Sequence, residues 1–300
     1  MEIDEIIAEL KQLDLSTKPE KRIRELLKLV GPIAYVIITF HKDKVMMRAR
    51  PNGSNRRFKA KVDFSYKPAE KNLTYQRAST PEQTMFYATV IPDKIEQGEL
   101  DNMRIIGITE TLPIMRDKTA SGYLKISFGK WVAEDDITLL AIVHKDKYLE
   151  ESNYTKELVS SYKTFLDQFP PDVVEKSMKF QTFMSEEFSK ENITENHDYM
   201  ISAIFSELAV ENGVEGIFYP SVRTSGRGFN VAIKPEATEK LRLVVAGECS
   251  LYKLKDHDVV GNDAIVEIPD DKVDFEIIDI ENHRSICLNK LGVKSIDDLK

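Results

Sequence analysis

The chain has little cysteine and lacks any apolar run long enough to cross a membrane. Its two cysteines, Cys249 and Cys287, form no CxxC pair, which indicates reduced thiols and predicts a cytoplasmic protein. The longest apolar run, residues 31–40, is about half the length that a bilayer span requires. Residues 1–7 are acidic where a signal or transit peptide would be basic, so we expect neither export nor a membrane partner.

Histidine is also scarce, and its distribution argues against a metal site. The five histidines are His41, His144, His197, His257 and His283. They are scattered along the chain without the spacing that zinc ligands show. We therefore predict no metal.

The formal net charge is −8, so acidic residues outnumber basic ones, but the charged residues are unevenly distributed along the chain. Residues 44–79 contain ten Lys or Arg against two Asp or Glu, a local balance of +8. Residues 256–300 contain twelve Asp or Glu against five Lys or Arg, a balance of −7. The long acidic tail argues against nucleic-acid binding. The basic segment favours a small anionic ligand, although a solvated surface explains either charge run equally well.

What the chain does contain is a strong alternation of helical and strand patterns, typical of an α+β fold. Apolar residues recur at helical spacing in residues 3–13, 23–30, 158–166, 174–188 and 199–208. Asp198 is a candidate N-cap for the last of these helices. The clearest strand patterns are in residues 33–40, 45–50, 85–89, 123–128, 137–143 and 241–252, so residues 44–148 read as mostly β with loops.

Residues 217–233 (IFYPSVRTSGRGFNVAI) are the most informative segment. Two apolar β-type runs flank a polar centre that combines hydroxyl, guanidinium and amide groups with two glycines. An ordinary hairpin needs only a short turn at that point. The segment is therefore either a solvated loop or an anion or nucleotide site at a strand end.

Together with four upstream motifs, this segment resembles the RES-domain family, named for its Arg, Glu and Ser. The family pattern is an Arg-containing turn, a Tyr-bearing strand about ten residues later, a Glu after an apolar run, a Gly-Lys/Arg-Trp strand end and a Tyr-Pro-Ser-Val-Arg segment with Gly and Asn. Here the matching residues are Arg77, Tyr87, Glu110, Gly129-Lys130-Trp131 and Tyr219-Pro220-Ser221-Val222-Arg223 with Gly228 and Asn230. The resemblance covers roughly residues 44–250, and the last motif is the most specific.

The resemblance implies an ADP-ribosyltransferase-like core of mixed or antiparallel sheets with peripheral helices. It also implies cleavage of NAD at the nicotinamide–ribose bond, with NAD as substrate, no permanently bound cofactor, and inorganic phosphate as a co-substrate in some members. Characterised members resemble NAD-degrading toxins of bacterial toxin–antitoxin pairs. A separate antitoxin protein and a homo-oligomer are therefore among the partners to test.

The family roles suit the chemistry of the matching catalytic residues. Glu110 would stabilise the oxocarbenium charge that develops on the ribose. Arg77 would hold the diphosphate through bidentate contacts. Tyr87 would offer a ring face to nicotinamide or a hydroxyl to the ribose. Ser221 would donate to the ribose or a phosphate, because no histidine lies near it in sequence to activate it as a nucleophile.

Four further residues are assigned to substrate binding. Arg48 fits an arginine at the start of the domain, acting as a phosphate clamp or in a structural ion pair. Tyr219, Arg223 and Asn230 would shape the site. Without the resemblance, these residues would have ordinary structural roles. Glu110 would be a strand-end or helix-cap carboxylate, Arg77 a surface residue and Tyr87 a core residue.

The sequence departs from the family pattern around the carboxylate. Compact members place the Glu about eleven residues after the Tyr, a window that here contains Glu96 and Glu99, whereas Glu110 lies twenty-three residues after Tyr87. We favour Glu110 because of its apolar lead-in and the downstream Gly-Lys-Trp, and interpret residues 93–104 as a polar insertion. Glu99 remains the alternative.

The absence of repeats or flexible linkers predicts one compact unit with additions at both ends. Residues 1–43 would form an N-terminal helical extension and first strand, residues 44–255 the RES-like catalytic domain, and residues 256–300 an acidic extension packed on the core. The predicted function is a NAD glycohydrolase or phosphorylase. The alternatives are an ADP-ribosyltransferase acting on a macromolecule and an inactive RES-like interaction module.

Overall fold

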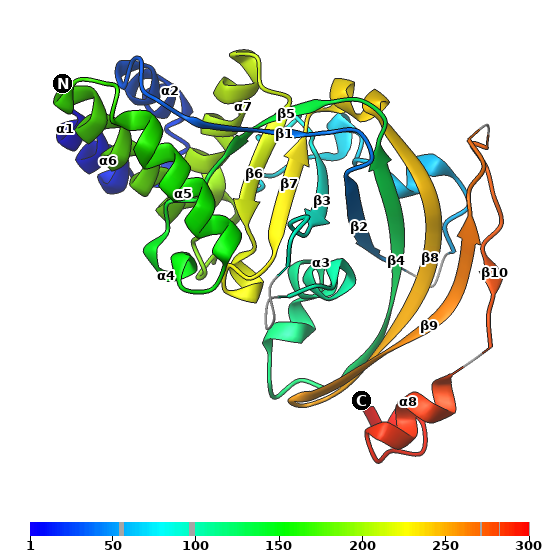
Figure 1. Cartoon of the computed structure of the whole chain (residues 1–300). Coiled ribbons are helices and arrows are strands. Elements are labelled where there is room, and N and C mark those ends of the chain that lie inside the picture. Colours follow the sequence, from blue (N-terminus) through cyan, green and yellow to red (C-terminus); the bar gives the residue numbers. More distant parts are fainter. Residues whose placement is uncertain (54–56, 96–99, 271, 282, 300) are drawn as a thin grey trace.

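Ten strands within the described residues form one mixed sheet, flanked by helices in an α+β arrangement (Figure 1). The computed structural model describes residues 1–53, 57–95, 100–270, 272–281 and 283–299. The strands are β1 (Val36–Phe40), β2 (Val45–Pro51), β3 (Phe86–Val90), β4 (Gly122–Ala133), β5 (Ile137–Ala141), β6 (Gly216–Pro220), β7 (Phe229–Ile233), β8 (Leu241–Leu254), β9 (His257–Glu267) and β10 (Ile278–Asp279). Their order is β1-β5-β6-β7-β3-β2-β4-β8-β9-β10. Only β5 and β6 pair in parallel within this described sheet.

The helices gather mainly on one half of this sheet. They are α1 (Ile3–Gln12), α2 (Glu20–Leu29), α3 (Met103–Thr111), α4 (Asp146–Leu149), α5 (Asn153–Leu166), α6 (Pro171–Phe188), α7 (Met200–Glu211) and α8 (Arg284–Lys290). No helix in the described ranges is both long and apolar enough to cross a bilayer.

We call strands β1, β5, β6, β7 and β3 the helix-covered half. Side chains on one face of these strands pack with α1, α2, α6 and α7, and side chains on the other face pack with α5. Both faces of the central strands are therefore covered, and every residue of β6 and β7 is buried. This burial explains why the two strands read as continuous apolar runs rather than as alternating ones.

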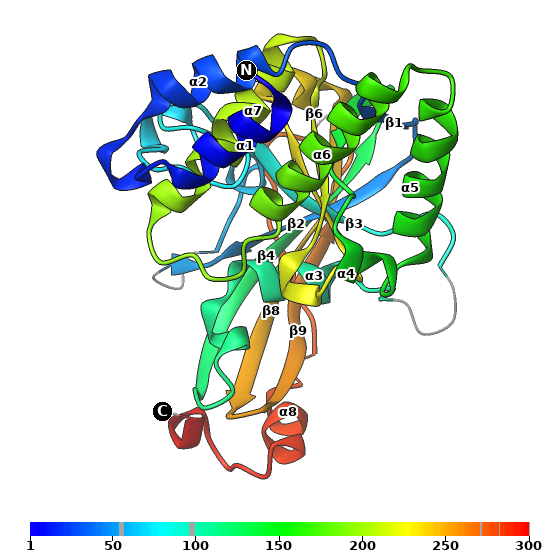
Figure 2. The same ribbon diagram turned by 90° about the vertical axis from the view of Figure 1, so that its left-hand side faces the viewer.

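We call strands β2, β4, β8, β9 and β10 the curved half. Its long strands bend around α3, which lies on the concave side (Figure 1), and they extend away from the other helices toward α8 (Figure 2). The acidic tail contributes β9 and β10 to this half, since β9 pairs with β8 and β10 pairs with β9. The N-terminal segment likewise contributes β1 at the opposite edge of the sheet, so all three predicted segments share one sheet.

The two halves meet at a sparsely paired seam between β3 and β2. The register there includes one residue pair, Met47 with Thr89, whereas β2 aligns along its whole length with β4. The Thr89 hydroxyl lies 3.0 Å from the carbonyl oxygens of both Met47 and Met103, so it links β3, β2 and α3. This splaying of the strands leaves room beside the sheet for a site.

Two sequence expectations need correction. Residues 103–111 form helix α3 inside a region expected to be mostly β, because the Asn102 side chain accepts from the backbone N–H groups of Arg104 and Ile105 and so caps a helix. Asp198 does not cap α7. Its carboxylate instead accepts from the backbone N–H groups of Thr194 and Glu195, which lie just before the 3-10 turn Asn196–Tyr199 that contains Asp198.

Candidate functional site

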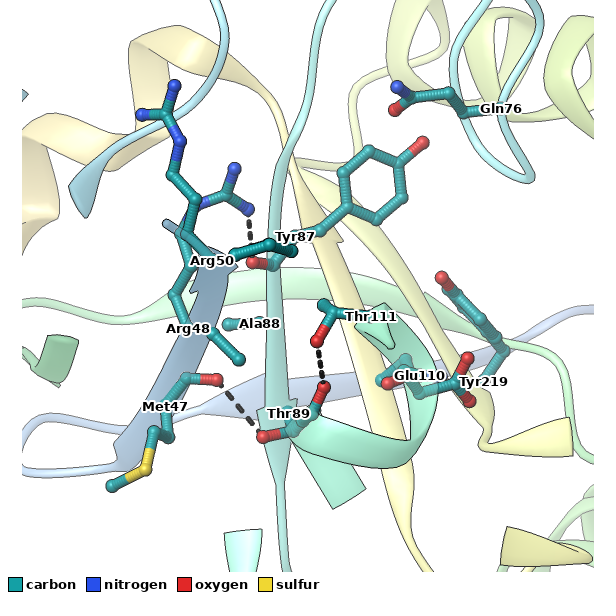
Figure 3. Close-up of a pocket in the computed structure, with 14 residues that line it drawn as sticks. Met47, Arg48, Arg50, Gln76, Tyr87, Ala88, Thr89, Glu110, Thr111 and Tyr219 are labelled. Atoms are coloured by element: carbon teal, nitrogen blue, oxygen red, sulfur yellow. Dashed lines mark hydrogen bonds between the residues drawn. The ribbon is translucent and has the colours of Figure 1, made fainter. Parts of the chain in front are cut away.

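A cleft of about 400 Å³ opens at the seam between the two halves (Figure 3). Its walls come from β2, β3, α3, β6 and β7, together with the turn before β3. Arg48 and Arg50 stand on one side, Glu110 and Tyr219 stand on the other, and the Tyr87 ring lies toward Gln76. The lining residues are Met47, Arg48, Ala49, Arg50, Pro51, Gln76, Tyr87, Ala88, Thr89, Gly107, Glu110, Thr111, Tyr219 and Asn230.

Glu110 is fixed by two residues that lie more than a hundred positions away in the sequence. Its Oε1 accepts a hydrogen bond from the Ser221 hydroxyl at 2.6 Å and another from Asn230 Nδ2 at 2.9 Å. Its Oε2 accepts no hydrogen bond from any described residue. The carboxylate is thus oriented by one oxygen, while the other stays available to a ligand.

The hairpin of β6 and β7 brings Ser221 and Asn230 to Glu110. Tyr219 pairs with Asn230 in the register, and the Ser221 N–H donates to Gly228 O at 2.7 Å. Gly228 lies directly against α3, since a Cβ there would stand 2.5 Å from Ile106 Cδ1. A larger residue at this position would push the hairpin away from the helix that carries Glu110.

Ser221 has a buried hydroxyl that is fully used within the protein. It donates to Glu110 and accepts from the Thr224 N–H at 3.2 Å, and the residue has no exposed surface. The predicted donation to ribose or phosphate is therefore not the contact that the hydroxyl makes here. In this arrangement Ser221 positions the carboxylate.

The two arginines of β2 occupy alternate positions, so both face the cleft. Arg48 Nη1 donates to Tyr87 O at 2.5 Å across the seam, and its guanidinium lies 5.4 Å from the Phe86 ring centre. Arg50 Nη1 donates to Asp63 O at 2.6 Å. Burial, with a contribution from Arg50, lowers the pKa of Arg48 to about 10. Neither arginine forms an ion pair with a described carboxylate, so the ion-pair alternative for Arg48 is not the arrangement observed.

Tyr87 presents its ring to the cleft, but its hydroxyl is already engaged. The oxygen accepts from the Ala78 N–H at 3.1 Å and lies 3.0 Å from Ser79 Oγ. Burial raises the pKa of Tyr87 to about 12. The hydroxyl therefore holds the turn of residues 76–79 against the cleft, and the ring face is the part open to a ligand.

A second, more polar hollow of about 320 Å³ adjoins the cleft and shares Gln76, Glu110 and Tyr219 with it. It contains Arg77, Arg116 and Arg223. We call these two hollows together the Glu110 cleft. Tyr219 is buried, which raises its pKa well above the usual value, and its ring packs 5.3 Å from that of Phe188.

Arg77 makes mainly internal contacts. Its two terminal nitrogens donate to Phe188 O at 2.6 Å and to Lys190 O at 3.1 Å, at the C-terminal end of α6. Its guanidinium lies 4.9 Å from the Tyr199 ring centre. A cation at a helix C-terminus is favourable, so this arginine anchors α6 beside the cleft. The bidentate diphosphate contact predicted for it would have to compete with these carbonyls.

Arg223 and Arg116 complete this arginine group. Arg223 Nη1 donates to Glu191 O at 3.2 Å. Burial, with a contribution from Arg223, lowers the pKa of Arg116. No ion pair with a described carboxylate forms at either residue, so both leave positive charge facing the hollow.

Arg50, Arg116 and Gln76 also line the cleft, and they match none of the sequence motifs. The alternation of Arg48 and Arg50 was a usable signal, because residues two apart in a strand face the same side. Arg116 lies in a 3-10 turn after α3 and has no sequence signal of its own. Glu96 and Glu99, the alternative carboxylates, lie outside the described residues.

Comparisons with known protein families and curated proteins identified no relative of this chain. No family model matches the chain, and no curated protein matches it. Among the described residues, no group of three or more His, Cys, Asp or Glu is arranged to hold a metal ion.

Proposed function

We propose that the protein binds NAD in the Glu110 cleft and cleaves its nicotinamide–ribose bond. The observation that carries the proposal is one oriented carboxylate, held by Ser221 and Asn230, on the wall of a cleft whose arginines have no carboxylate partner among the described residues. The RES resemblance supports it, because most of the residues matched by motif order line this cleft, although Gly129-Lys130-Trp131 lies outside it. We extend the proposal to an ADP-ribosyltransferase-like core of the RES type.

The chemistry needs an anion beside the ribose more than it needs a proton carrier. When the C1′–N bond breaks, its electron pair moves to the nicotinamide nitrogen and neutralises the pyridinium. The ribose then carries oxocarbenium charge, which a fixed carboxylate stabilises. Glu110 Oε2 is the group for this role, and water or phosphate would capture C1′, with a proton lost from that acceptor.

The arginines would neutralise the diphosphate of the same ligand. Arg48 and Arg50 lie across the cleft from Glu110, which places positive charge at a distance from the oxocarbenium centre (Figure 3). A guanidinium offers paired donors that match phosphate oxygens. The Tyr87 ring, between the two sides, would pack against a flat part of the ligand.

The test measures nicotinamide release from NAD, with and without inorganic phosphate. We expect release by the wild-type protein and a loss of about 10²–10³-fold in Glu110→Gln, because the fixed charge is removed while the shape is kept. Glu239→Gln, at an exposed position, is the matched control. Absence of release by the wild type under both conditions would refute the proposal. Full activity in Glu110→Gln would refute the role of Glu110.

Product analysis separates the related functions. Free ADP-ribose indicates a glycohydrolase, and a phosphorylated product that forms only with phosphate indicates a phosphorylase. Labelled NAD that leaves its label on a protein or nucleic acid indicates a macromolecular ADP-ribosyltransferase. An intact fold that does not bind NAD indicates an interaction module. We further propose a toxin or defence role with a separate neutralising protein, tested by the fall in cellular NAD on expression.

A further inference from the structure

A separate hollow of about 360 Å³ is lined by residues of α3 and of the long strands of the curved half. Figure 1 shows α3 on the concave side of these strands. Met47 borders both this hollow and the Glu110 cleft. We call it the α3 hollow. Its lining residues are Met47, Arg104, Phe128, Lys130, Val245, Gly247, Cys249, Asn262, Ala264, Ile265 and Ile280.

The walls of the α3 hollow are largely apolar and partly open to solvent. Val245, Gly247 and Cys249 follow one another at alternate positions of β8, and Ile265 on β9 is 49% exposed. Gly247 adds no side chain to the floor, so the space above it stays open. Small-molecule sites are typically concave and mostly apolar, with volumes of about 300–1,000 Å³ and a few convergent polar groups.

Two cations supply the polar groups of the α3 hollow. Arg104 Nη1 donates to Asn262 Oδ1 at 2.6 Å and lies 3.9 Å from Cys249 Sγ, so its partners in the structure are neutral. The Lys130 ammonium forms no hydrogen bond or ion pair with any described residue, although its backbone pairs within the sheet. No acidic residue occurs among the described residues that line the hollow. Charge complementarity therefore favours an anion.

Two other cations of the curved half, unlike Arg104 and Lys130, form ion pairs with carboxylates. Arg57 and Lys125 both contact the buried carboxylate of Glu248, at 3.2 and 3.3 Å. Arg57 also contacts Asp279 at 2.6 Å. Arg104 and Lys130 thus differ from Arg57 and Lys125, because they have no carboxylate partner among the described residues.

We propose that the α3 hollow binds a small amphipathic anion that has an apolar chain and a single carboxylate head. The chain lies along Val245, Gly247 and Ile265. The head lies at Arg104, where a carboxylate oxygen replaces the Asn262 amide oxygen as the acceptor. Lys130, in register with Val245, adds positive charge at the other end of the hollow. The site is distinct from the Glu110 cleft, and it does not depend on the function proposed there.

Decanoate binding to the full chain, measured by isothermal titration calorimetry, tests the site. We expect decanoate to bind the wild type and Arg104→Met to weaken binding about tenfold through loss of the charge-assisted contact. Lys130→Met should weaken binding less, because it removes a more distant positive charge. Arg242→Met is the control, since Arg242 pairs with Glu134 and Asp270 outside the hollow. Circular dichroism checks that each variant is folded.

Two further titrations separate this site from nonspecific binding and from the Glu110 cleft. Decan-1-ol should bind at least tenfold more weakly than decanoate, and NAD should not displace decanoate. The proposal is overturned if decanoate does not bind, if it binds both variants as tightly as the wild type, if the alcohol binds equally well, or if NAD competes with it.

Discussion

The helix-covered half and the curved half share one sheet but differ in how they use it. In the helix-covered half, the central strands β6 and β7 are buried on both faces, and the side chains of this half build the main cores. In the curved half, long strands bend around one small helix, and apolar residues such as Ile265 stay half exposed on the concave side. The helix-covered half is therefore a closely packed framework, whereas the curved half leaves open space beside its strands.

The candidate site draws on both halves because it lies at their seam. The β6–β7 hairpin of the helix-covered half provides Ser221 and Asn230, and β2 of the curved half provides Arg48 and Arg50. Glu110 comes from α3, which sits between them. A site at the junction of the packed helix-covered half and the more open curved half can hold the Glu110 carboxylate in place and still admit a ligand.

The largest expected effect is on the free energy of unfolding, and it comes from a comparison of side-chain packing in the two halves. Phe218 is 2% exposed and stacks on Phe229 at 4.8 Å in the helix-covered half. Phe218→Ala should lower the free energy of unfolding by about 3–5 kcal/mol. Ile265→Ala, in the curved half, should change it by less than about 0.5 kcal/mol. Urea denaturation measures both, and a large loss in Ile265→Ala would mean that the concave side is covered in solution.

Acid sensitivity should come from the helix-covered half. His144 is buried, and its ring nitrogens have no hydrogen-bond partner among the described residues. Burial, aided by Lys163, lowers its pKa from 6.5 to about 4. The unfolded state therefore binds the proton first, so the free energy of unfolding is unaffected above about pH 6.5. It should fall by up to about 3 kcal/mol as the pH decreases toward 4.

His144→Phe isolates this contribution from that of the carboxylates. The phenyl ring fills similar space beside Tyr162, whose ring centre lies 4.8 Å from that of His144. Urea denaturation at pH 7.5 and pH 4.5 should show a smaller acid-dependent loss in the variant than in the wild type. Equal losses would show that His144 does not titrate as inferred.

The seam itself should give the smallest effect. Thr89→Val keeps the side-chain shape but removes the hydroxyl that contacts both Met47 O and Met103 O. We expect a loss of about 1–2 kcal/mol and faster amide hydrogen exchange in β2 and α3. Thr138→Val is the control, because the Thr138 hydroxyl makes no hydrogen bond to a described residue. Equal behaviour of the two variants would show that the halves are held together elsewhere.

Local patterns predicted much of the helix-covered half. Helical periodicity marked α1, α2, α5, α6 and α7, and the apolar runs of residues 217–233 marked both strands of the hairpin. These features depend on neighbours close in sequence, which is why they can be read directly. The same reading missed α3, because the closely spaced apolar residues Ile105, Ile106 and Ile108 resemble a strand and the capping role of Asn102 was not recognised.

The sequence by itself determined the residue types of the candidate site and the order of its motifs. Only the tertiary structure decided that Ser221 contacts Glu110, that Arg77 anchors α6 and that Arg116 joins the cleft. These outcomes depend on strand register and on the close approach of Gly228 to α3, which are contacts between distant segments. Contacts between distant segments leave no periodic pattern in the sequence. The sequence therefore determines which chemical groups are present, and the tertiary packing determines which of them are in contact.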